Sequence, residues 1–372
     1  MRDDTKHEYE FIQAAPRFAG TINERSTYDG LFKTDNFDDR SYREEFERRC
    51  RARASERVGA YHFRDIELTG AWMLISTEQC RTAYNLLPGI GWTQQHIDLF
   101  LTRQKMDHVL ALNKHVDRAV SYFPGKYVLL AYPGAFTYGH FLVDISIRIQ
   151  LAKSMGLHMD AKFLIPSPIQ PWFLPLLSLA GISIDDCVTL GGRERARVEQ
   201  LYVPTLTGND GVLHRSVAEY AFKRIKEVMS NILGPKGASR QLLFPLHTPM
   251  SSRLNPIQVE QRGYICDVLR GRFGIETFNP LQMTFAQQVD KFRHASLVVG
   301  EDSSALHNIL WSDGADLVVI APFGKMNFYH IGIQSLNGGR TAILWGDNAN
   351  PTTGHFRIDI DSLCRTISGL MQ

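Results

Sequence analysis

A histidine, an aspartate and an arginine recur at four-residue intervals in the segment FTYGHFLVDISIR, residues 136–148. Residues four apart are neighbours on a helix surface, so His140, Asp144 and Arg148 would form a polar stripe beside an apolar face. A carboxylate one turn from an imidazole can orient it and raise its basicity, or can act as the base itself while the guanidinium holds its ionised form. The structural alternative is a helix ion pair between Asp144 and Arg148, with His140 half-buried and satisfied.

A second polar group follows the apolar residues 297–299 and leads into an expected helix. Gly300 would permit a tight turn, and Asp302 or Ser303 is a natural N-cap. Small residues at a helix start leave N–H groups and the positive end of the helix dipole open to an anion such as a diphosphate. The residues expected at this site are Gly300, Glu301, Asp302, Ser303, Ser304 and Ala305. The two carboxylates would repel a phosphate unless a cation or Arg253 intervenes, and an ordinary capped helix is the alternative.

Short apolar runs alternate with helical patterns and would position both groups. The run YVLLAY at 127–132 ends at a Pro-Gly turn, as expected for a buried parallel strand whose carboxyl end carries the first group. Paired strands are expected within 61–75. Further strands are expected at 162–165, 188–190, 198–203, 241–244, 275–278, 297–299 and 317–320, with helices at 172–180, 216–232, 256–271, 285–293 and 303–311. This alternation predicts an α/β fold with two Rossmann-like units and a ligand cleft between them.

The small polar stretch TLTGNDG at 205–211 is the best linker in the chain. We expect a charged N-terminal extension, a first Rossmann-like domain, a second one, and a C-terminal helix that could pack back on the N-terminal domain. Their respective boundaries are 1–57, 58–207, 208–350 and 351–372. Because no GxGxxG follows a strand, and GxxxxGK(S/T) and GxSxG are missing, dinucleotide dehydrogenases, P-loop NTPases and hydrolases with a nucleophile elbow are disfavoured.

The composition is that of a globular protein, with 44% hydrophobic residues, 22% charged residues and a net charge of +2. So small a charge disfavours a nucleic-acid partner. The five cysteines include no CxxC pair, which argues against zinc ribbons and disulfide scaffolds and fits a cytoplasmic protein. No signal peptide is recognisable and the apolar runs are too short to span a bilayer, so at most peripheral membrane contact is expected. The charged segment at 42–57 could serve self-association as a homodimer.

At both polar groups the chain resembles glycosyltransferase family 61. The first half of that family carries a stretch like Asn-Tyr-Gly-His-Trp-Leu-Leu-Asp-x-Leu-Pro-Arg, and residues 137–148 match it at Tyr138, Gly139, His140, Leu142, Asp144 and Arg148. Its second half has a Ser-Phe-x-Glu-Gln-like helix and a strand ending in Gly-Pro-His-Gly-Ala-Gly-Leu. Residues 283–289 resemble the helix, and residues 298–308 resemble the strand and its turn in part.

The resemblance implies a GT-B architecture, in which two Rossmann-like domains face each other across a cleft. It implies an inverting glycosyltransferase that moves a sugar from a nucleotide-sugar to a glycan acceptor, for example a bacterial capsule or other surface polysaccharide. No tightly bound cofactor and no metal are predicted. Asp144 or His140 would deprotonate the acceptor hydroxyl, and Tyr138, Gly139 and Arg148 would bind the acceptor or support the site.

The expected donor pocket departs from the family pattern. Glu301-Asp302-Ser303 stands where the family has Pro-His-Gly, and His307, one turn further on, could replace the missing imidazole. Arg253 would hold the diphosphate together with the N–H groups of residues 303–305. The other donor contacts expected here are Phe323 and Asn327. Two alternatives stay open: a nucleotide-sugar-modifying enzyme such as an epimerase, and a degenerate, non-catalytic binding subunit.

Overall fold

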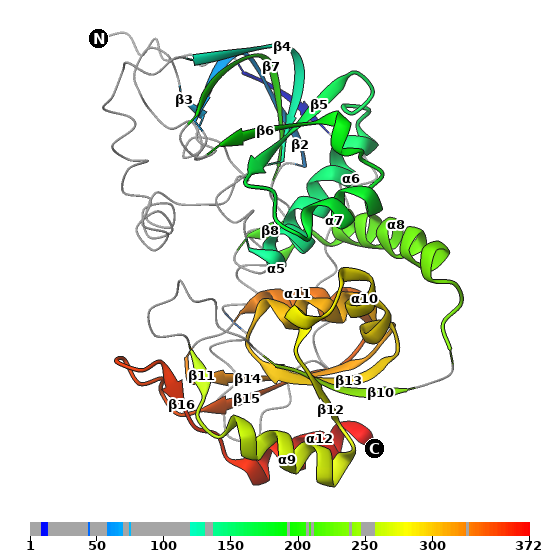
Figure 1. Cartoon of the computed structure of the whole chain (residues 1–372), viewed down its shortest axis with the longest axis vertical. Helices are drawn as coiled ribbons and strands as arrows, with labels where there is room; N and C mark the ends of the chain where they lie inside the picture. Colours follow the sequence, from blue (N-terminus) through cyan, green and yellow to red (C-terminus); the bar gives the residue numbers. More distant parts are fainter. Residues whose placement is uncertain are drawn as a thin grey trace. The chain divides into compact units, whose positions relative to one another are not determined.

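The computed structural model describes residues 9–13, 44, 58–69, 74–75, 120–130, 137–191, 194–205, 208–209, 212–237, 240–246, 257–324 and 327–372. The chain forms two compact units, which Figure 1 traces in sequence colours. The first unit comprises residues 1–21, 54–209 and 214–225, and the second comprises residues 22–53, 210–213 and 226–372. Helix α8 (Arg215–Leu233) runs from one unit into the other.

The first unit is built on a seven-stranded sheet in the order β1-β2-β7-β4-β5-β6, with β3 paired to β2. Its strands are β1 (Tyr9–Gln13), β2 (Gly59–Thr69), β3 (Leu74–Ile75), β4 (Val120–Leu129), β5 (Ala161–Ser167), β6 (Cys187–Gly191) and β7 (Arg195–Pro204). Its helices before α8 are α5 (Tyr138–His140), η3 (Phe141–Ile145), α6 (Ser146–Ser154), α7 (Phe173–Leu179) and η4 (Ile184–Asp186). Strands β4 to β7 run parallel, whereas β1 and β2 are antiparallel additions.

The parallel strands of this sheet lie in the order β6-β5-β4-β7, which is 3-2-1-4 in chain order. That is the first part of the Rossmann order, and the direction of winding reverses between β4 and β7. Ligands of such sheets bind outside the carboxyl ends of the strands at the reversal. The helical segment that follows β4 therefore starts at the position where a ligand is expected.

Two boundary predictions differ from the structure of the first unit. Part of the expected N-terminal extension belongs to the sheet, because β1 pairs with β2 from Tyr9 opposite Phe63 to Gln13 opposite Gly59. The expected linker carries two short paired strands, β8 (Gly208–Asn209) and β9 (Val212–Leu213). The paired strands expected within 61–75 are confirmed as β2 and β3.

The second unit is built on a five-stranded parallel sheet in the order β12-β10-β13-β14-β15. Its strands are β10 (Gln241–Pro245), β12 (Glu276–Phe278), β13 (Ala295–Glu301), β14 (Asp316–Pro322) and β15 (Thr341–Gly346), with a separate pair β11 (Gln258–Val259) and β16 (His355–Phe356). Its helices are α9 (Arg262–Phe273), η5 (Pro280–Gln282), α10 (Phe285–Arg293), η6 (Ser304–Trp311), α11 (Phe328–Asn337) and α12 (Ile360–Met371). The chain order 2-1-3-4-5 is the flavodoxin-like order, with its reversal between β10 and β13.

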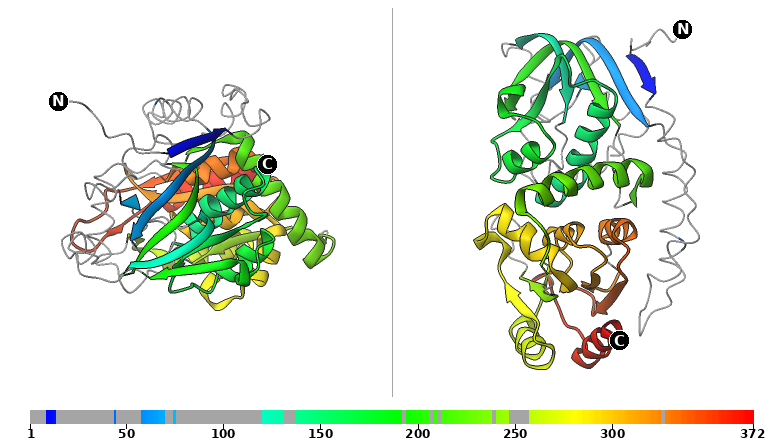
Figure 2. Two further views of the ribbon diagram at one scale, coloured as in Figure 1. Left: turned by 90° about the horizontal axis from the view of Figure 1, so that it is seen from above. Right: turned by 90° about the vertical axis from the view of Figure 1, so that its right-hand side faces the viewer.

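Helices cover both faces of this second sheet. Figures 1 and 2 show α9 and α12 on one face and α10 and α11 on the other. The α/β class is therefore confirmed, with a Rossmann-type strand order in each unit. The GT-B arrangement concerns how the two units face each other, and it stays a prediction.

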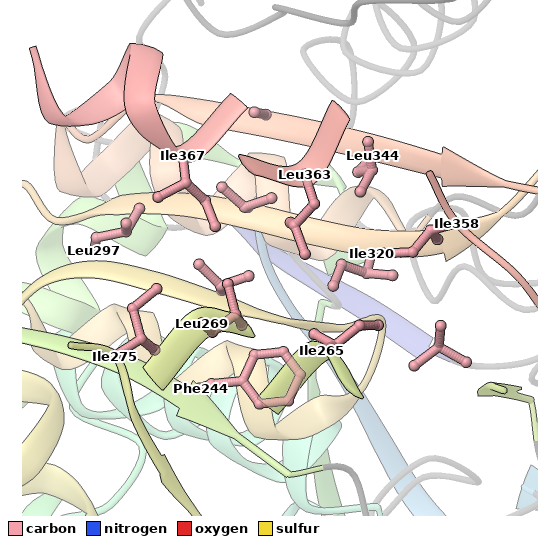
Figure 3. Close-up of a cluster of buried hydrophobic side chains, with 14 of the residues drawn as sticks. Phe244, Ile265, Leu269, Ile275, Leu297, Ile320, Leu344, Ile358, Leu363 and Ile367 are labelled. Carbon is pink, nitrogen blue, oxygen red and sulfur yellow. The ribbon is translucent and has the colours of Figure 1, made fainter. Parts of the chain in front are cut away.

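The hydrophobic core between the second sheet and helices α9 and α12 shows where the C-terminal helix packs (Figure 3). Alternate residues of the central strands, such as Leu297 and Val299, point into this core because successive strand side chains point to opposite faces. Leu363, Ile367 and Leu370 of α12 join the same cluster, at a spacing that forms one stripe on a helix. Helix α12 thus packs on the second unit, and the option of packing on the N-terminal domain is wrong.

Candidate functional site

The first polar group lies in the helical segment after β4. A π-helical turn, η3, is inserted between α5 and α6, and it begins directly after His140 and includes Asp144. The His140 Nδ1 and Asp144 Oδ2 atoms are 2.9 Å apart. The Asp144 side chain is only 1% exposed, whereas the His140 side chain is 28% exposed. The buried carboxylate therefore orients an imidazole that remains reachable, and π-turns of this kind occur frequently at functional sites.

Arg148 ties this helix to the ends of two strands. Its fully buried guanidinium donates from Nε and Nη2 to the Pro204 carbonyl, at 3.1 and 2.9 Å, and from Nη1 to the Leu130 carbonyl at 3.5 Å. These carbonyls end β7 and follow β4, the strands between which the winding reverses. Arg148 thereby fixes the helix that carries His140 and Asp144 against the carboxyl edge of the sheet.

The exposure of this helix differs from the sequence prediction. Residues 141–152 are all buried, Asp144 and Arg148 among them, so the helix has no polar face exposed to water. Of the predicted stripe, only His140 is partly exposed. The pattern of apolar residues could not reveal this, because it does not show which residues of the surrounding chain cover the other side.

The segment also contacts an aromatic residue, Trp172, that the sequence did not single out as a site residue. The ring of Tyr138 packs edge-on against Trp172, with centroids 5.9 Å apart, and Gly139 is buried beside it. Trp172 follows β5, the parallel neighbour of β4, so both rings lie beyond the same carboxyl edge. Its Nε1 atom is buried without a hydrogen-bond partner in the described residues. The only sequence signal was a tryptophan closely following a strand.

Glu301, at the end of β13, is buried and forms an ion pair inside the protein. Its side chain is 3% exposed, and Arg262 donates to it from Nε at 2.6 Å and from Nη2 at 3.0 Å. The Val259 backbone N–H donates to the same carboxylate at 2.9 Å. Both carboxylate oxygens are thus engaged by the protein. Arg262 compensates its charge, and a role of Glu301 as a donor contact stays a prediction.

Asp302, the residue after β13, contacts helix α11, which lies on the opposite face of the sheet from α9 (Figure 1). Its Oδ1 atom lies 2.7 Å from Nε2 of His330, which belongs to the first turn of α11. The Asp302 side chain is 24% exposed and the His330 side chain 2%. His307 is the neighbour of this imidazole, with ring centroids 5.1 Å apart. His330 therefore places an imidazole beside Asp302, the residue that stands where the family pattern has a histidine.

The start of η6 combines small residues with buried polar atoms. Ser303 precedes the helix in an extended conformation, and its Oγ atom is buried without a hydrogen-bond partner in the described chain. Ser304 and Ala305 are half-buried at the helix start. Gly300 is required by packing, since a Cβ atom there would lie 2.7 Å from Cδ2 of Leu306.

The other residues predicted to contact the donor lie outside the turn at residues 300–305. Asn327 caps α11, because its Oδ1 atom accepts from the Tyr329 backbone N–H at 3.1 Å. Phe323 is 48% exposed, and its ring lies edge-on to Trp345, with centroids 6.4 Å apart. Both rings follow or end strands at the carboxyl edge, so Trp345 is an aromatic neighbour that the sequence did not single out. Arg253 lies outside the described residues.

The two carboxylate–imidazole pairs are arranged in opposite ways. In the first, the carboxylate of Asp144 is buried and the imidazole of His140 is the more exposed member. In the second, the imidazole of His330 is buried and the carboxylate of Asp302 is the more exposed member. A ligand reaching the first pair would meet an imidazole, which can accept a proton near neutral pH. A ligand reaching the second would meet a carboxylate, which accepts hydrogen bonds.

A cavity of about 490 Å³ lies at the other, amino edge of the second sheet. Its lining includes Lys226, Met229, Lys236, Arg293, Trp311 and Asp313. The Lys226 ammonium donates to the Ser312 carbonyl at 2.8 Å, and Arg293 donates to the Gly234 carbonyl at 2.8 Å. These carbonyls follow the ends of η6 and α8, so the cations cap two helix C-termini. Lys226 and Arg293 therefore stabilise the fold at this cavity, and the candidate functional site is the one at the carboxyl edge of the sheet.

Across the described parts of the chain, no group of three or more His, Cys, Asp or Glu side chains is placed to hold a metal ion. The expectation of no bound metal stays a prediction. In the same residues, no helix combines the length and apolar character needed to span a membrane.

A comparison with protein families supports a sugar-transfer role for this α/β chain. Residues 138–319 match the family model described as Glycosyltransferase 61. This match supports glycosyltransferase family 61 for the segment that starts at Tyr138 and includes His140, Asp144 and Asp302. The resemblance seen in the sequence is confirmed. No curated protein matches the chain significantly.

Two solved structures show a weak similarity. The E. coli heptosyltransferase WaaC with ADP is 8% identical, with a TM-score of 0.33, covering 66% of this chain and 99% of that one. A family 9 glycosyl transferase from Veillonella parvula DSM 2008 is 10% identical, with a TM-score of 0.31, covering 61% of this chain and 87% of that one. Scores this low say nothing about how the two units are arranged.

Proposed function

We propose that the chain is an inverting glycosyltransferase that moves a sugar from a nucleotide-sugar to a hydroxyl of a glycan acceptor, as in surface polysaccharide synthesis. The observation that carries this proposal is the His140–Asp144 pair, with a 2.9 Å contact, a buried carboxylate and a reachable imidazole. Inverting transfer needs one base for the acceptor hydroxyl, and an imidazole oriented by a carboxylate is a common general base. The pair follows a strand at the reversal of the first sheet, where ligands of such folds bind.

In this proposal His140 is the base and Asp144 is a positioning residue. Asp144 accepts from Nδ1–H of His140, and Nε2 is the ring nitrogen that takes the proton of the acceptor hydroxyl. The acceptor oxygen then forms its bond to the anomeric carbon while the bond from that carbon to the diphosphate oxygen breaks. Hydrogen-bond donors around the diphosphate stabilise the departing negative charge. Transfer from the opposite side of the anomeric carbon inverts its configuration.

Two variants and one control test these roles. His140→Gln removes the proton acceptor and should lower kcat by roughly 100- to 10,000-fold, the usual contribution of general base catalysis. Asp144→Asn should lower kcat strongly as well, because the amide cannot hold the same imidazole tautomer, while donor binding stays close to wild type. His355→Gln, at an exposed histidine, is the matched control and should be fully active. An active His140→Gln enzyme would refute the assignment of the base.

A nucleotide-binding screen separates the proposed transferase from its alternatives. Calorimetry with nucleoside diphosphates should show preferred binding of one base, followed by transfer of the corresponding sugar to an acceptor. Isomerisation of the donor sugar without any acceptor would instead establish a nucleotide-sugar-modifying enzyme. Binding of no nucleotide would establish a non-catalytic subunit and refute the proposal.

A further inference from the structure

The carboxylate of Asp302, at the carboxyl edge of the second sheet, is positioned by a buried histidine. Asp302 follows β13, and its backbone N–H donates to the Ile320 carbonyl of β14 at 2.9 Å. His330 approaches from α11 and contacts Oδ1 at 2.7 Å, and its side chain is 2% exposed. Among the described residues, Oδ2 of Asp302 has no hydrogen-bond partner. The pair thus presents one oriented carboxylate whose second oxygen is available.

Two further polar atoms at this place leave hydrogen-bonding capacity for a ligand. Ser303 Oγ and His330 Nδ1 are both buried, and neither has a hydrogen-bond partner in the described residues. Buried polar groups are almost always satisfied in folded proteins, by protein, by water or by a ligand. Unsatisfied atoms on the residue next to Asp302 and on its imidazole partner therefore point to a polar ligand at this position.

The charge of the site determines which part of a nucleotide-sugar can lie there. A carboxylate repels a diphosphate, and within the described residues no Lys or Arg side chain pairs with Asp302 as Arg262 pairs with Glu301. Hydroxyl groups, in contrast, donate hydrogen bonds to carboxylates, and charge-assisted bonds of this type are strong. We infer that Asp302, positioned by His330, recognises hydroxyl groups of the donor, either of its ribose or of the transferred sugar. This inference rests on the proposed function, since it concerns the donor of that reaction.

The direction in which a substitution of Asp302 changes donor affinity tests the inference. Asp302→Asn should weaken binding of the preferred nucleoside diphosphate or nucleotide-sugar by roughly ten- to hundred-fold, as expected for a lost hydrogen bond to a charged group. If Asp302 instead lay against the diphosphate, removal of its negative charge would leave binding unchanged or tighten it. Asp313→Asn, at an exposed aspartate on the amino edge, is the matched control and should bind like wild type.

A comparison of ligands shows whether Asp302 binds hydroxyl groups of the ribose or of the transferred sugar. Calorimetry would compare ADP, GDP, CDP and UDP with their 2′-deoxy forms, and then the glucose and galactose derivatives of the base that binds best. A loss confined to the ribonucleotide places Asp302 on the ribose, whereas a loss confined to the nucleotide-sugar places it on the transferred sugar. His330→Gln should reproduce the same ligand dependence more weakly, while a purely structural role would weaken all ligands equally.

The outcomes separate this inference from the proposed function. If wild type binds a nucleotide but Asp302→Asn binds every ligand as tightly or more tightly, hydroxyl recognition is overturned and the transferase proposal stands. If wild type binds no nucleotide, both are overturned. A folded Asp302→Asn protein, checked by its thermal transition, is required for either comparison, and the near-isosteric change at a partly exposed position favours it.

Discussion

Arg262→Met is the most informative perturbation of the second unit. Arg262 is the cation that neutralises Glu301, with two donor atoms at 2.6 and 3.0 Å from the carboxylate. Methionine keeps the length and apolar character of the arginine stem but removes the charge. The variant therefore leaves the Glu301 carboxylate, which is 3% exposed, without its counter-charge.

The expected cost follows from the burial of the pair. Removing one partner of a buried ion pair typically destabilises a protein by about 3–5 kcal/mol. The Arg262 side chain is 25% exposed, so water reaches part of the pair and the lower end, about 3 kcal/mol, applies. For a unit of this size, that corresponds to a fall in Tm of roughly 6–12 °C.

Thermal and urea unfolding would measure this cost in three variants. Arg262→Met should show the full destabilisation, while the double variant Arg262→Met with Glu301→Gln should recover a large part, because no charge is then left buried. Arg270→Met, on the same helix with a side chain 62% exposed, is the control and should lie within about 0.5 kcal/mol of wild type. A stable Arg262→Met protein, or a double variant as unstable as the sum of the singles, would refute an internal role for Glu301.

Two further predictions concern the fold. Leu363→Ala in α12 should destabilise the second unit by about 2–5 kcal/mol in urea unfolding, because it leaves a cavity in a filled core. Leu281→Ala, at a residue 70% exposed, is the control and should be close to neutral. Equal effects of the two variants on stability would refute the packing of α12 described above. Burial and the neighbouring Asp186 raise the pKa of Cys187 to about 12. The folded protein therefore keeps this proton when the unfolded chain loses it near pH 9, so the stabilising contribution is present below that pH and is lost as the pH rises. Peptide mapping at pH 8 should show slow labelling of Cys187 by a thiol reagent in the native protein and fast labelling after unfolding; fast native labelling would contradict the shift.

Much of the fold could be predicted from local patterns. Apolar runs of strand length alternating with helical periodicity indicated two parallel-sheet units, because such patterns depend on the period of the backbone alone. The boundaries were harder, since β1 is separated from its partner β2 by a long intervening segment. The packing of α12 was open for a similar reason, because a C-terminal helix could be expected from the sequence but the surface that covers it could not.

The first candidate pair was determined by sequence spacing, because His140 and Asp144 are one helical turn apart and contact each other within the same segment. The second pair was decided by the tertiary structure. Glu301 and Asp302 are adjacent and chemically alike, yet one is paired with Arg262, 39 positions away, and the other with His330, 28 positions away. Adjacent strand residues face opposite sides of a sheet, so helices from distant parts of the chain decide which carboxylate is compensated and which is presented.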